Sequence, residues 1–542
     1  MKKKVLKVTV ALLMSLTLLL VACAPAGDGN QAADPPAADT ADTDDTADTD
    51  DGAAPERGGD VMEVSVVHWQ MGGHFDSAGN SDPVTNWAMD QFGIQFEVIN
   101  VTLDDAHERI QTWAAAGSLP DIIGATAIVG NPQYFQWIED GVVRALPDDL
   151  SPWPYVEHFI NLPEVQAFSV DGRNYFLPRL VYPDPDWWAM DRAIYNRRDW
   201  REALGIPVPV TEQDYIDMWV AFATLDPNGD GSITQGFAPR GLWTLFSQGF
   251  PSFGFFEHGW QWSADGSTVV LPSMEPDAIP LLSFLRRAYA AGGIDPDFVT
   301  FGAFDARDRL IAGQLGSMAW QGSPQHVYMV AQEWYAVHGT DLLDYIEILP
   351  GPDVGVTPVR FMTSSFWSES YINSSVEDEK LHRILDFYNF FYSPEGITMR
   401  RFGFEGEHFE IVNGEINVLQ SFHDFDEAHY GVFSLVLWVN DLIQYENPEI
   451  PLAIREFVTE HRDYRIANWD APNVNYSIRA IDIPERAEMA GIIIGDDWAR
   501  FVVDTSDTPD QQLWQEMYDN WIAHGYGVAK EAMTAEAIRR GY

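Results

Sequence analysis

The chain has 542 residues, too many for one compact core, so we expect two to four domains. Its 46% hydrophobic content excludes wholesale disorder. Asp and Glu number 82 against 32 Lys and Arg, and the formal net charge of −50 excludes nucleic-acid binding through phosphate contacts. The chain has a single cysteine, so it forms no intrachain disulfide and no Cys-based zinc site.

The first 22 residues have the pattern of a signal peptide. A lysine-rich start precedes Val8–Ala22, an uncharged run too short to span a membrane. The run ends in Leu20-Val21-Ala22-Cys23, which resembles the lipobox of bacterial lipoproteins. This resemblance implies a diacylglycerol on Cys23, so the lipid anchor is the chain's membrane contact, and the protein faces the extracellular side or the periplasm. The alternative is a plain secreted protein in which Cys23 has no role.

Residues 23–60 are predicted to be a disordered acidic tether that begins at the lipidated cysteine. Ala, Asp, Thr, Gly and Pro dominate it, with the near-repeat ADTADTDDTADTDD at 38–51. Such a segment buries too little apolar surface to fold, and its like charges keep it extended. An acidic tail that binds a partner is the alternative.

Strand and helix patterns alternate from residue 61 onward. The β-branched runs 61–69 and 93–101 and the short run 119–123 predict strands, and residues 104–116 predict a helix that ends at Gly117. Apolar residues at helical spacing in 381–391 predict another helix. This alternation indicates an α/β fold with open parallel sheets covered by helices.

Eight segments, in this order behind the lipobox, resemble the extracellular solute-binding proteins, family 1, of ABC sugar importers, in particular the long oligosaccharide-binding branch. The segments are SLPDII (118–123), DGVVRALPDDL (140–150), DGRNYFLPR (171–179), IYNRRDWREALGIPVPVT (194–211), DPNGDGSITQG (226–236), GIDPDF (293–298), GQLGSMAW (313–320) and GFEGEHFEIVNGEI (403–416).

The resemblance implies a two-lobed periplasmic-binding-protein-like fold with a hinge and an interlobe cleft. We expect lobe 1 to comprise residues 61–182 plus about 358–440, and lobe 2 about 183–357 plus 441–542. The family also implies an oligosaccharide ligand held in the cleft and delivery to the membrane subunits of an ABC permease. We expect a monomer.

The segment 226–232 has the spacing of a calcium loop. Carboxylate and amide oxygens stand at positions 1, 3 and 5, with glycine at position 6, as in an EF-hand, but position 12 is Phe237 instead of a bidentate Glu. The resembling family often has acidic residues two and three places beyond the carbonyl position, where this chain has neutral oxygens. We predict a structural Ca²⁺ bound by Asp226, Asn228, Asp230, Ser232, Thr234 and Gln235. The alternative is a turn stabilised by its own side chains.

Aromatic residues carry the case for sugar binding, because indole rings pack on the C–H faces of sugars. Trp69 ends the first strand, where open α/β sheets bind ligands, and two other Trp residues lie near the lobe crossings that the family implies. For each Trp the alternative is burial in a core. The candidate ligand-binding residues are Trp69, Asp121, Arg179, Trp188, Trp320 and Trp367.

We therefore predict a surface-tethered receptor that binds an oligosaccharide noncovalently and is not an enzyme. The motifs H-E-x-x-H, G-x-S-x-G and G-x-x-x-x-G-K-[ST] are absent from the sequence, and we nominate no catalytic residue. The alternatives are a secreted lipoprotein enzyme acting on polysaccharide and a peptide-binding receptor of the same fold. The sequence leaves open whether the receptor serves uptake or sensing, and whether the sugar is a uronic acid.

Overall fold

The computed structural model describes residues 61–69, 71, 83–124, 126–182, 185–241, 259–352, 358–361, 364–420, 432–436, 444–471 and 474–542. The predicted signal peptide, the lipidation site Cys23 and the acidic tether lie outside the described residues. The signal peptide, the lipid anchor and the tether therefore stay predictions from the sequence.

The first sheet has five strands in the order β2-β1-β3-β11-β4. They are β1 (Met62–His68), β2 (Ile94–Asn100), β3 (Ile122–Ile123), β4 (Phe176–Leu180) and β11 (Phe366–Ile372). Strand β1 pairs in parallel with β2 and β3, whereas β11 runs antiparallel to β3 and β4. The carboxyl ends of β1 and β3 therefore lie at the same edge of the sheet as the start of β11.

The second sheet has four strands in the order β10-β5-β9-β6. They are β5 (Ala193–Arg197), β6 (Gln235–Ala238), β9 (Leu315–Trp320) and β10 (Ile346–Ile348). Only the β6–β9 pair is parallel, since β5 runs antiparallel to both β9 and β10. The prediction of parallel sheets was thus wrong for both sheets, which are mixed. Strand β11 joins the first sheet only after the chain has built the second, so no local strand–helix–strand unit, which would produce a parallel pair, connects it to β3 or β4.

Helices account for most of the remaining described elements. They are α1 (Pro83–Phe92), α2 (Leu103–Ala116), α3 (Pro132–Glu139), α4 (Pro154–Ile160), α5 (Pro163–Gln166), α6 (Arg198–Ala203), α7 (Glu212–Thr224), α8 (Ile279–Ala290), α9 (Asp305–Ile311), α10 (Pro324–His338), α11 (Asp378–Tyr392), α12 (Pro394–Phe402), α13 (Leu452–Asn468), α14 (Tyr476–Arg479), α15 (Ile494–Val503), α16 (Asp510–Ala523) and α17 (Tyr526–Arg540). Two small antiparallel pairs, β7 (Gln261–Trp262) with β8 (Val269–Val270) and β12 (Phe409–Val412) with β13 (Glu415–Val418), complete the strands among the described residues.

Both predicted helices, at 104–116 and 381–391, are confirmed as α2 and α11. The hydroxyl of Thr102 accepts the N–H of Asp105 and caps the start of α2. Gly117, with φ of 65°, ends that helix in the left-handed conformation that glycine adopts without strain. The predicted apolar stripe of α11 is buried, at Leu381, Ile384, Leu385, Tyr388 and Phe391.

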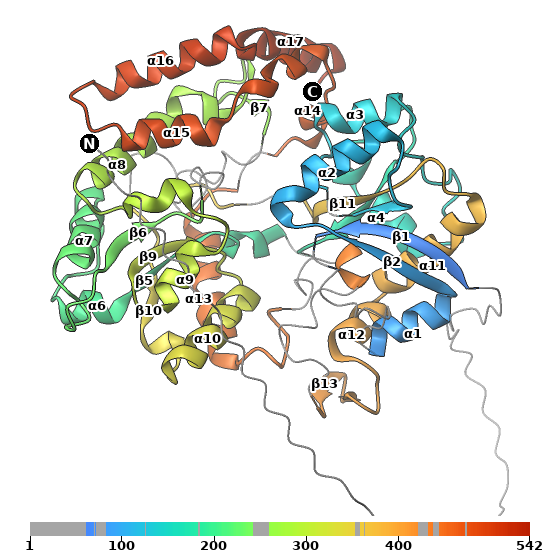
Figure 1. The fold of residues 1–542 in the computed structure, drawn as a ribbon, viewed down its shortest axis with the longest axis horizontal. Helices are drawn as coiled ribbons and strands as arrows, with labels where there is room; N and C mark the ends of the chain where they lie inside the picture. The colour runs from blue at the N-terminus through green and yellow to red at the C-terminus, as the bar shows by residue number, and fades with distance from the viewer. Residues whose placement is uncertain are drawn as a thin grey trace, which may run out of the picture. The chain divides into compact units, whose positions relative to one another are not determined.

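Each main sheet has its own hydrophobic core. The core of the first sheet draws on two separated stretches, from Val64 to Leu180 and from Phe366 to Val436, with Ala480 added. The cores around the second sheet use residues between 190 and 349 and return after residue 445. Figure 1 shows α2 on one side of β1 and β2, with α1 on the other. The chain thus builds one sheet, leaves it for the second, and returns. Among the described residues, none of the helices has the length and apolar character that crossing a bilayer requires.

Candidate functional site

A pocket of about 240 Å³ lies at the edge of the first sheet where β1 and β3 end. Trp69 follows β1, and Trp367 lies at the start of β11, so two of the predicted ligand-binding residues line it together. Its full lining is Trp69, Ala106, His107, Ile110, Gln111, Thr126, Ala127, Ile128, Gln133, Trp137 and Trp367. Aromatic rings mixed with neutral hydrogen-bonding groups are the chemistry that a sugar ring requires.

The exposure of Trp367 arises from an irregularity in the sheet. The register between β11 and β4 shifts between Phe366 and Ser368, which leaves Trp367 between the two paired positions. Such bulges re-aim a side chain. Trp367 is 40% exposed, while the rest of β11 is buried. A large aromatic surface is therefore available at the pocket.

Helix α2 supplies one wall of the pocket. Ala106, His107, Ile110 and Gln111 share one face of the helix because they are spaced three and four residues apart. Gln111 Nε2 and His107 Nε2 lie 3.0 Å apart in a hydrogen bond, which orients both polar groups. This wall offers hydrogen-bonding groups beside a small apolar surface.

A buried carboxylate holds the loop that forms another wall. Glu369 on β11 is fully buried, and its Oε1 accepts the backbone N–H groups of Ile128 at 2.6 Å and Val129 at 3.0 Å. The same oxygen accepts the hydroxyls of Thr126 at 3.0 Å and Tyr371 at 2.9 Å. Burial raises the pKa of the Glu369 carboxyl, against the lowering effect of these hydrogen bonds. The loop includes Ala127, whose φ of 51° is in the left-handed region that non-glycine residues rarely adopt.

Arg179 lies beside the pocket but does not line it. Its guanidinium is 5.9 Å from the ring centroid of Trp69, its Nη1 is 3.5 Å from Ser368 Oγ, and the residue is 1% exposed. His68 stacks on Trp69 with 6.0 Å between ring centroids. Burial and the nearby positive charge of Arg179 lower the pKa of His68 well below its ordinary value. Arg179 and His68 thus support Trp69 from within the protein.

Asp121 lies apart from this pocket. Its Oδ2 accepts the backbone N–H of Ser65 at 2.8 Å and binds Lys380 Nζ at 3.0 Å. Ser65 is in the middle of β1, and Asp121 stands just before β3. The carboxylate therefore connects β1 to helix α11 at the middle of β1, away from the carboxyl edge of the sheet where the pocket lies.

Trp188 is placed in a separate buried cluster. It is 3% exposed, packs edge to face on Tyr182 and Phe361, and donates its indole N–H to the carbonyl of Ser364 at 3.1 Å. Its ring is therefore engaged by protein groups.

Trp320 ends β9 in the second sheet and is 5% exposed. The guanidinium of Arg240, which follows β6, lies 4.3 Å from its ring centroid, and that of Arg307 lies 5.7 Å away. Because β6 and β9 are parallel, this cluster lies at the edge where both strands end. The contact between Arg240 and Trp320 at this edge of the second sheet corresponds to the contact between Arg179 and Trp69 in the first sheet.

The predicted calcium loop forms an exposed turn stabilised by its own side chains. Asp226 Oδ2 accepts the N–H of Gly231 at 3.1 Å, and Asp230 Oδ1 accepts that of Ser232 at 2.8 Å. Hydrogen bonding with Ser232 holds the pKa of the Asp230 carboxyl below its ordinary value. Asn228 Nδ2 donates to Ser232 Oγ at 3.1 Å and to the carbonyl of Gly313 at 3.0 Å.

The predicted calcium ligands fit a cation only in part. Asp226, Asn228, Asp230 and Ser232 supply oxygen atoms within one turn, and two of them are carboxylates, as a hard cation prefers. Thr234 is buried and donates its hydroxyl to the carbonyl of Phe222 at 2.6 Å, while Gln235 begins β6. In the part of the chain that the structure describes, no three His, Cys, Asp or Glu side chains gather as a metal-binding group.

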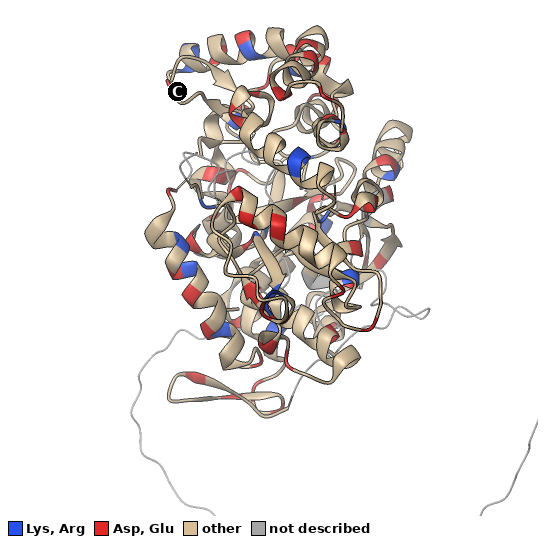
Figure 2. Ribbon diagram, turned by 90° about the vertical axis from the view of Figure 1, so that its left-hand side faces the viewer, with Lys and Arg blue, Asp and Glu red and all other residues tan. Residues whose placement is uncertain are grey.

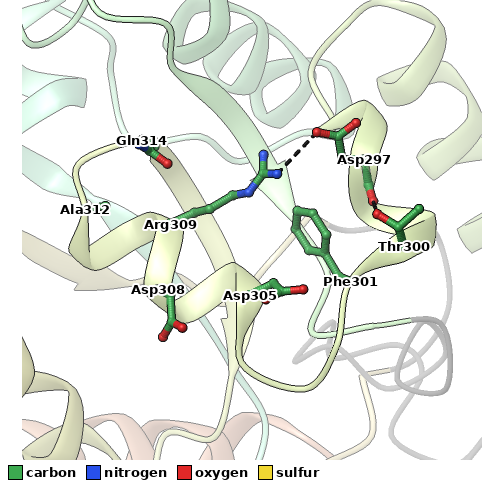
Figure 3. A pocket seen from close by; sticks show the side chains of 8 residues that line it. All are labelled: Asp297, Thr300, Phe301, Asp305, Asp308, Arg309, Ala312 and Gln314. Atoms are coloured by element: carbon green, nitrogen blue, oxygen red, sulfur yellow. Dashed lines mark hydrogen bonds and ion pairs between the residues drawn. The ribbon is translucent and has the colours of Figure 1, made fainter. Parts of the chain in front are cut away.

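A larger cavity of about 420 Å³ lies around helix α9 (Figure 3). Arg309 crosses it to reach Asp297 at 3.2 Å and also binds the buried Asp295 at 2.6 Å. Asp305 and Asp308 add further carboxylates to the lining. None of the predicted ligand-binding residues lines this cavity, and its charged side chains are engaged by protein groups: Arg309 by Asp297, Asp305 by the N–H of Gly302, and Asp308 by Arg307.

Several residues of the aromatic pocket were not among those predicted from the sequence. His107, Gln111 and Ile110 share a face of a helix that was predicted, so their spacing could have indicated a common surface. Glu369 carried no such signal, because it is one of 82 acidic residues and its partners lie about 240 positions earlier in the chain.

Sequence comparison finds relatives among bacterial lipoproteins and sugar-binding proteins. The chain is 24% identical over 328 residues to Lipoprotein LipO of Bacillus subtilis, covering 57% of this chain and 63% of that protein. It is 22% identical over 308 residues to the polygalacturonan/rhamnogalacturonan-binding protein YtcQ of Bacillus subtilis, covering 56% of this chain and 58% of that protein. The chain thus matches less than two thirds of the length of these curated relatives. No family model matches the chain.

Solved structures agree over nearly the whole folded region. The alginate-binding protein AlgQ2 without calcium ion has a TM-score of 0.67 at 16% identity, covering 88% of this chain and 98% of that one. The Streptococcus pneumoniae ABC-transporter substrate-binding protein FusA in complex with kestose has a TM-score of 0.67 at 16% identity, covering 89% and 99%. A FusA EF-hand mutant in complex with fructo-nystose matches equally well.

These likenesses define the class of fold. The chain has the two-lobed α/β fold of the solute-binding proteins of ABC transporters, which confirms the predicted fold class and the resemblance. Its relatives in sequence are named as a lipoprotein, a polygalacturonan/rhamnogalacturonan-binding protein and a fructooligosaccharide ABC transporter substrate-binding protein.

Proposed function

We propose that this protein is a surface-tethered receptor that binds an oligosaccharide noncovalently and delivers it to an ABC permease. The observation that carries the proposal is the pocket that Trp69 and Trp367 both line at the carboxyl edge of the first sheet. The named ligands of relatives with this fold, kestose and fructooligosaccharide among them, support a sugar as the solute.

The mechanism we infer is closure of the two lobes on the solute. A sugar held by Trp69 and Trp367 would meet the Trp320 edge of the second sheet when the lobes close. The solute then stabilises the closed state because it contacts both lobes only in that state. The protein leaves the sugar chemically unchanged and acts as a monomer. Lipidation at Cys23 holds it on the outer side of the cell membrane.

We also propose a structural Ca²⁺ at the 226–235 loop, with Asp226 and Asp230 as its charged ligands. The turn already presents these oxygens together, and solved relatives include an EF-hand mutant and a protein described without its calcium ion. A bound Ca²⁺ would supply charge neutralisation and stiffness to the turn. The binding of sugar is done by other residues.

The test is a thermal-shift screen of the full chain carrying Cys23→Ala against oligosaccharides, with peptides as controls. A ligand at 100 times its Kd stabilises the folded state by about 2.7 kcal/mol, which a melting curve resolves. An oligosaccharide that stabilises the protein and is recovered intact supports the receptor. Recovery of a cleaved sugar would establish an enzyme, and stabilisation by peptides alone would refute the sugar assignment.

A further inference from the structure

Among the described residues that line the aromatic pocket, none has a side chain with a permanent positive charge. Its polar lining residues are Thr126, Gln111, Gln133 and His107, and neither lysine nor arginine is among the described residues that form it. Neutral amides and hydroxyls pair with sugar hydroxyls. A carboxylate buried there would lose its hydration without gaining a cationic partner, which is unfavourable.

The sequence excludes a cation from the parts that the structure leaves undescribed. From residue 61 onward, the undescribed segments contain no lysine or arginine, including residues 70 and 72–82 that follow Trp69. Every permanent cation of the folded region is therefore a described residue. Figure 2 shows Lys and Arg distributed among Asp and Glu on several helices.

Arg179, a cation beside the pocket, is buried within the protein. Arg179 is 1% exposed and lies over Trp69, with its Nη1 toward Ser368. At 1% exposure, Arg179 is not accessible to form the bidentate pair that recognises a carboxylate.

The arginines at the corresponding edge of the second sheet are also engaged. Arg240 Nη1 donates to Gln321 Oε1 at 2.7 Å, and its Nε donates to the carbonyl of Ala303 at 3.3 Å. Arg307 forms ion pairs with Asp308 and Glu333, each at 3.0 Å. An anionic sugar would have to compete with these protein partners.

We propose that the pocket takes an uncharged sugar residue and that the solute is a neutral oligosaccharide rather than a polyuronate. This inference rests on the proposed function. It separates the chain from those relatives whose names give polygalacturonan or alginate, and places it with those whose names give a fructooligosaccharide. A polyuronate carries a carboxylate on every ring, so any ring seated between Trp69 and Trp367 would bring one into the pocket. The net charge of −50 adds a long-range repulsion of anionic chains at low salt.

The experiment is calorimetric titration of the full chain carrying Cys23→Ala at pH 8. The matched probes are an oligogalacturonide and its methyl ester, which share a backbone and differ in charge. Fructo-, xylo- and manno-oligosaccharides extend the neutral set. Each titration is run at about 0.1 M and about 1 M salt, where the Debye length falls from about 10 Å to about 3 Å.

We expect a neutral probe to bind with an affinity that salt leaves unchanged, and the free acid to bind at least about tenfold more weakly than its ester or the best neutral sugar. Binding of the free acid that is equal or tighter, weakens with salt and is lost in Arg240→Ala would overturn this inference and leave the receptor function intact. If no sugar of either kind binds, the proposed function fails, and this inference fails with it.

Discussion

The carboxylate of Glu369 accepts the backbone N–H of Ile128 at 2.6 Å and so connects β11 to the loop that forms a wall of the aromatic pocket. The two residues are 241 positions apart. Between Thr126 and Ile128, Ala127 is held at φ of 51°, a conformation that needs such support. The shape of the pocket therefore depends on a buried acid that has no room to contact the solute.

Replacing this acid with its amide should change the pH dependence of stability. Burial raises the pKa of Glu369, so the folded protein binds a proton more tightly there than the unfolded chain does. The wild-type free energy of unfolding therefore gains a contribution as pH falls from the raised pKa toward the ordinary value of 4.5, and loses it as pH rises. Glu369→Gln should lack this contribution, which denaturation curves measured between about pH 4.5 and 8 will show.

The alanine variant separates charge from positioning. Glu369→Ala removes the acceptor of Thr126, Ile128 and Val129, so ligand affinity should fall at every pH. Glu369→Gln keeps an acceptor oxygen and should retain more of that affinity. If the free energy of unfolding depends on pH identically in the wild type and in Glu369→Gln, the raised pKa of Glu369 is contradicted.

The two tryptophan rings that line the pocket, partly buried Trp69 and exposed Trp367, should dominate ligand binding. Trp69→Ala and Trp367→Ala are each expected to weaken the sugar that binds the wild type by about tenfold, as removal of a stacking aromatic does at an interface. Trp367 is 40% exposed, so its removal should leave the melting temperature nearly unchanged. Tyr335→Ala on α10, at 64% exposure, is the matched control. Equal affinities for Trp367→Ala and Tyr335→Ala would refute the pocket.

Sequence patterns located part of this site because part of it is locally encoded. The apolar run of β1 and the capped helix α2 follow from period and end signals, and they fix Trp69 and the wall at residues 106–111. The aim of Trp367 depends on a bulge against β4, which is a pairing between distant strands. The direction of β11 and the burial of Glu369 are likewise products of tertiary pairing. Local periodicity carries no information about them.

Trp188 should prove to be a core residue. It is 3% exposed and packs on Tyr182 and Phe361. Trp188→Ala should therefore lower the free energy of unfolding by about 3–5 kcal/mol, and Trp188→Phe by less, since the phenyl ring refills part of the space. Chemical denaturation measures both. Unchanged stability with lost sugar affinity in Trp188→Phe would instead restore the ligand-binding interpretation made from the sequence.

Asp121 should act on stability and leave ligand affinity unchanged. Its carboxylate accepts the N–H of Ser65 at 2.8 Å and pairs with Lys380 at 3.0 Å. Asp121→Ala leaves a strand N–H without its acceptor and should cost about 1–3 kcal/mol. Lys380→Ala removes only the partly exposed ion pair and should cost no more than about 1 kcal/mol. A loss of sugar affinity in Asp121→Ala, with Lys380→Ala unchanged, would place Asp121 at the ligand.

Calcium should stabilise the folded chain through the 226–235 loop. Adding CaCl₂ to chelator-treated protein should raise the melting temperature, by an amount that grows with concentration as mass action requires. Asp230→Ala should abolish the increment because it removes one of the two carboxylates in the turn.

Asp230→Ala also loses a hydrogen bond to Ser232, so its melting temperature without calcium falls for a reason unrelated to the metal. Asp149→Ala is the matched control, because Asp149 accepts the N–H of Ser151 at 3.0 Å in the same local arrangement outside the loop. The quantity compared between variants is therefore the rise in melting temperature on adding calcium, and not the melting temperature without calcium. If Asp230→Ala and Asp149→Ala both keep the wild-type increment, the loop is a self-stabilised turn and calcium acts elsewhere.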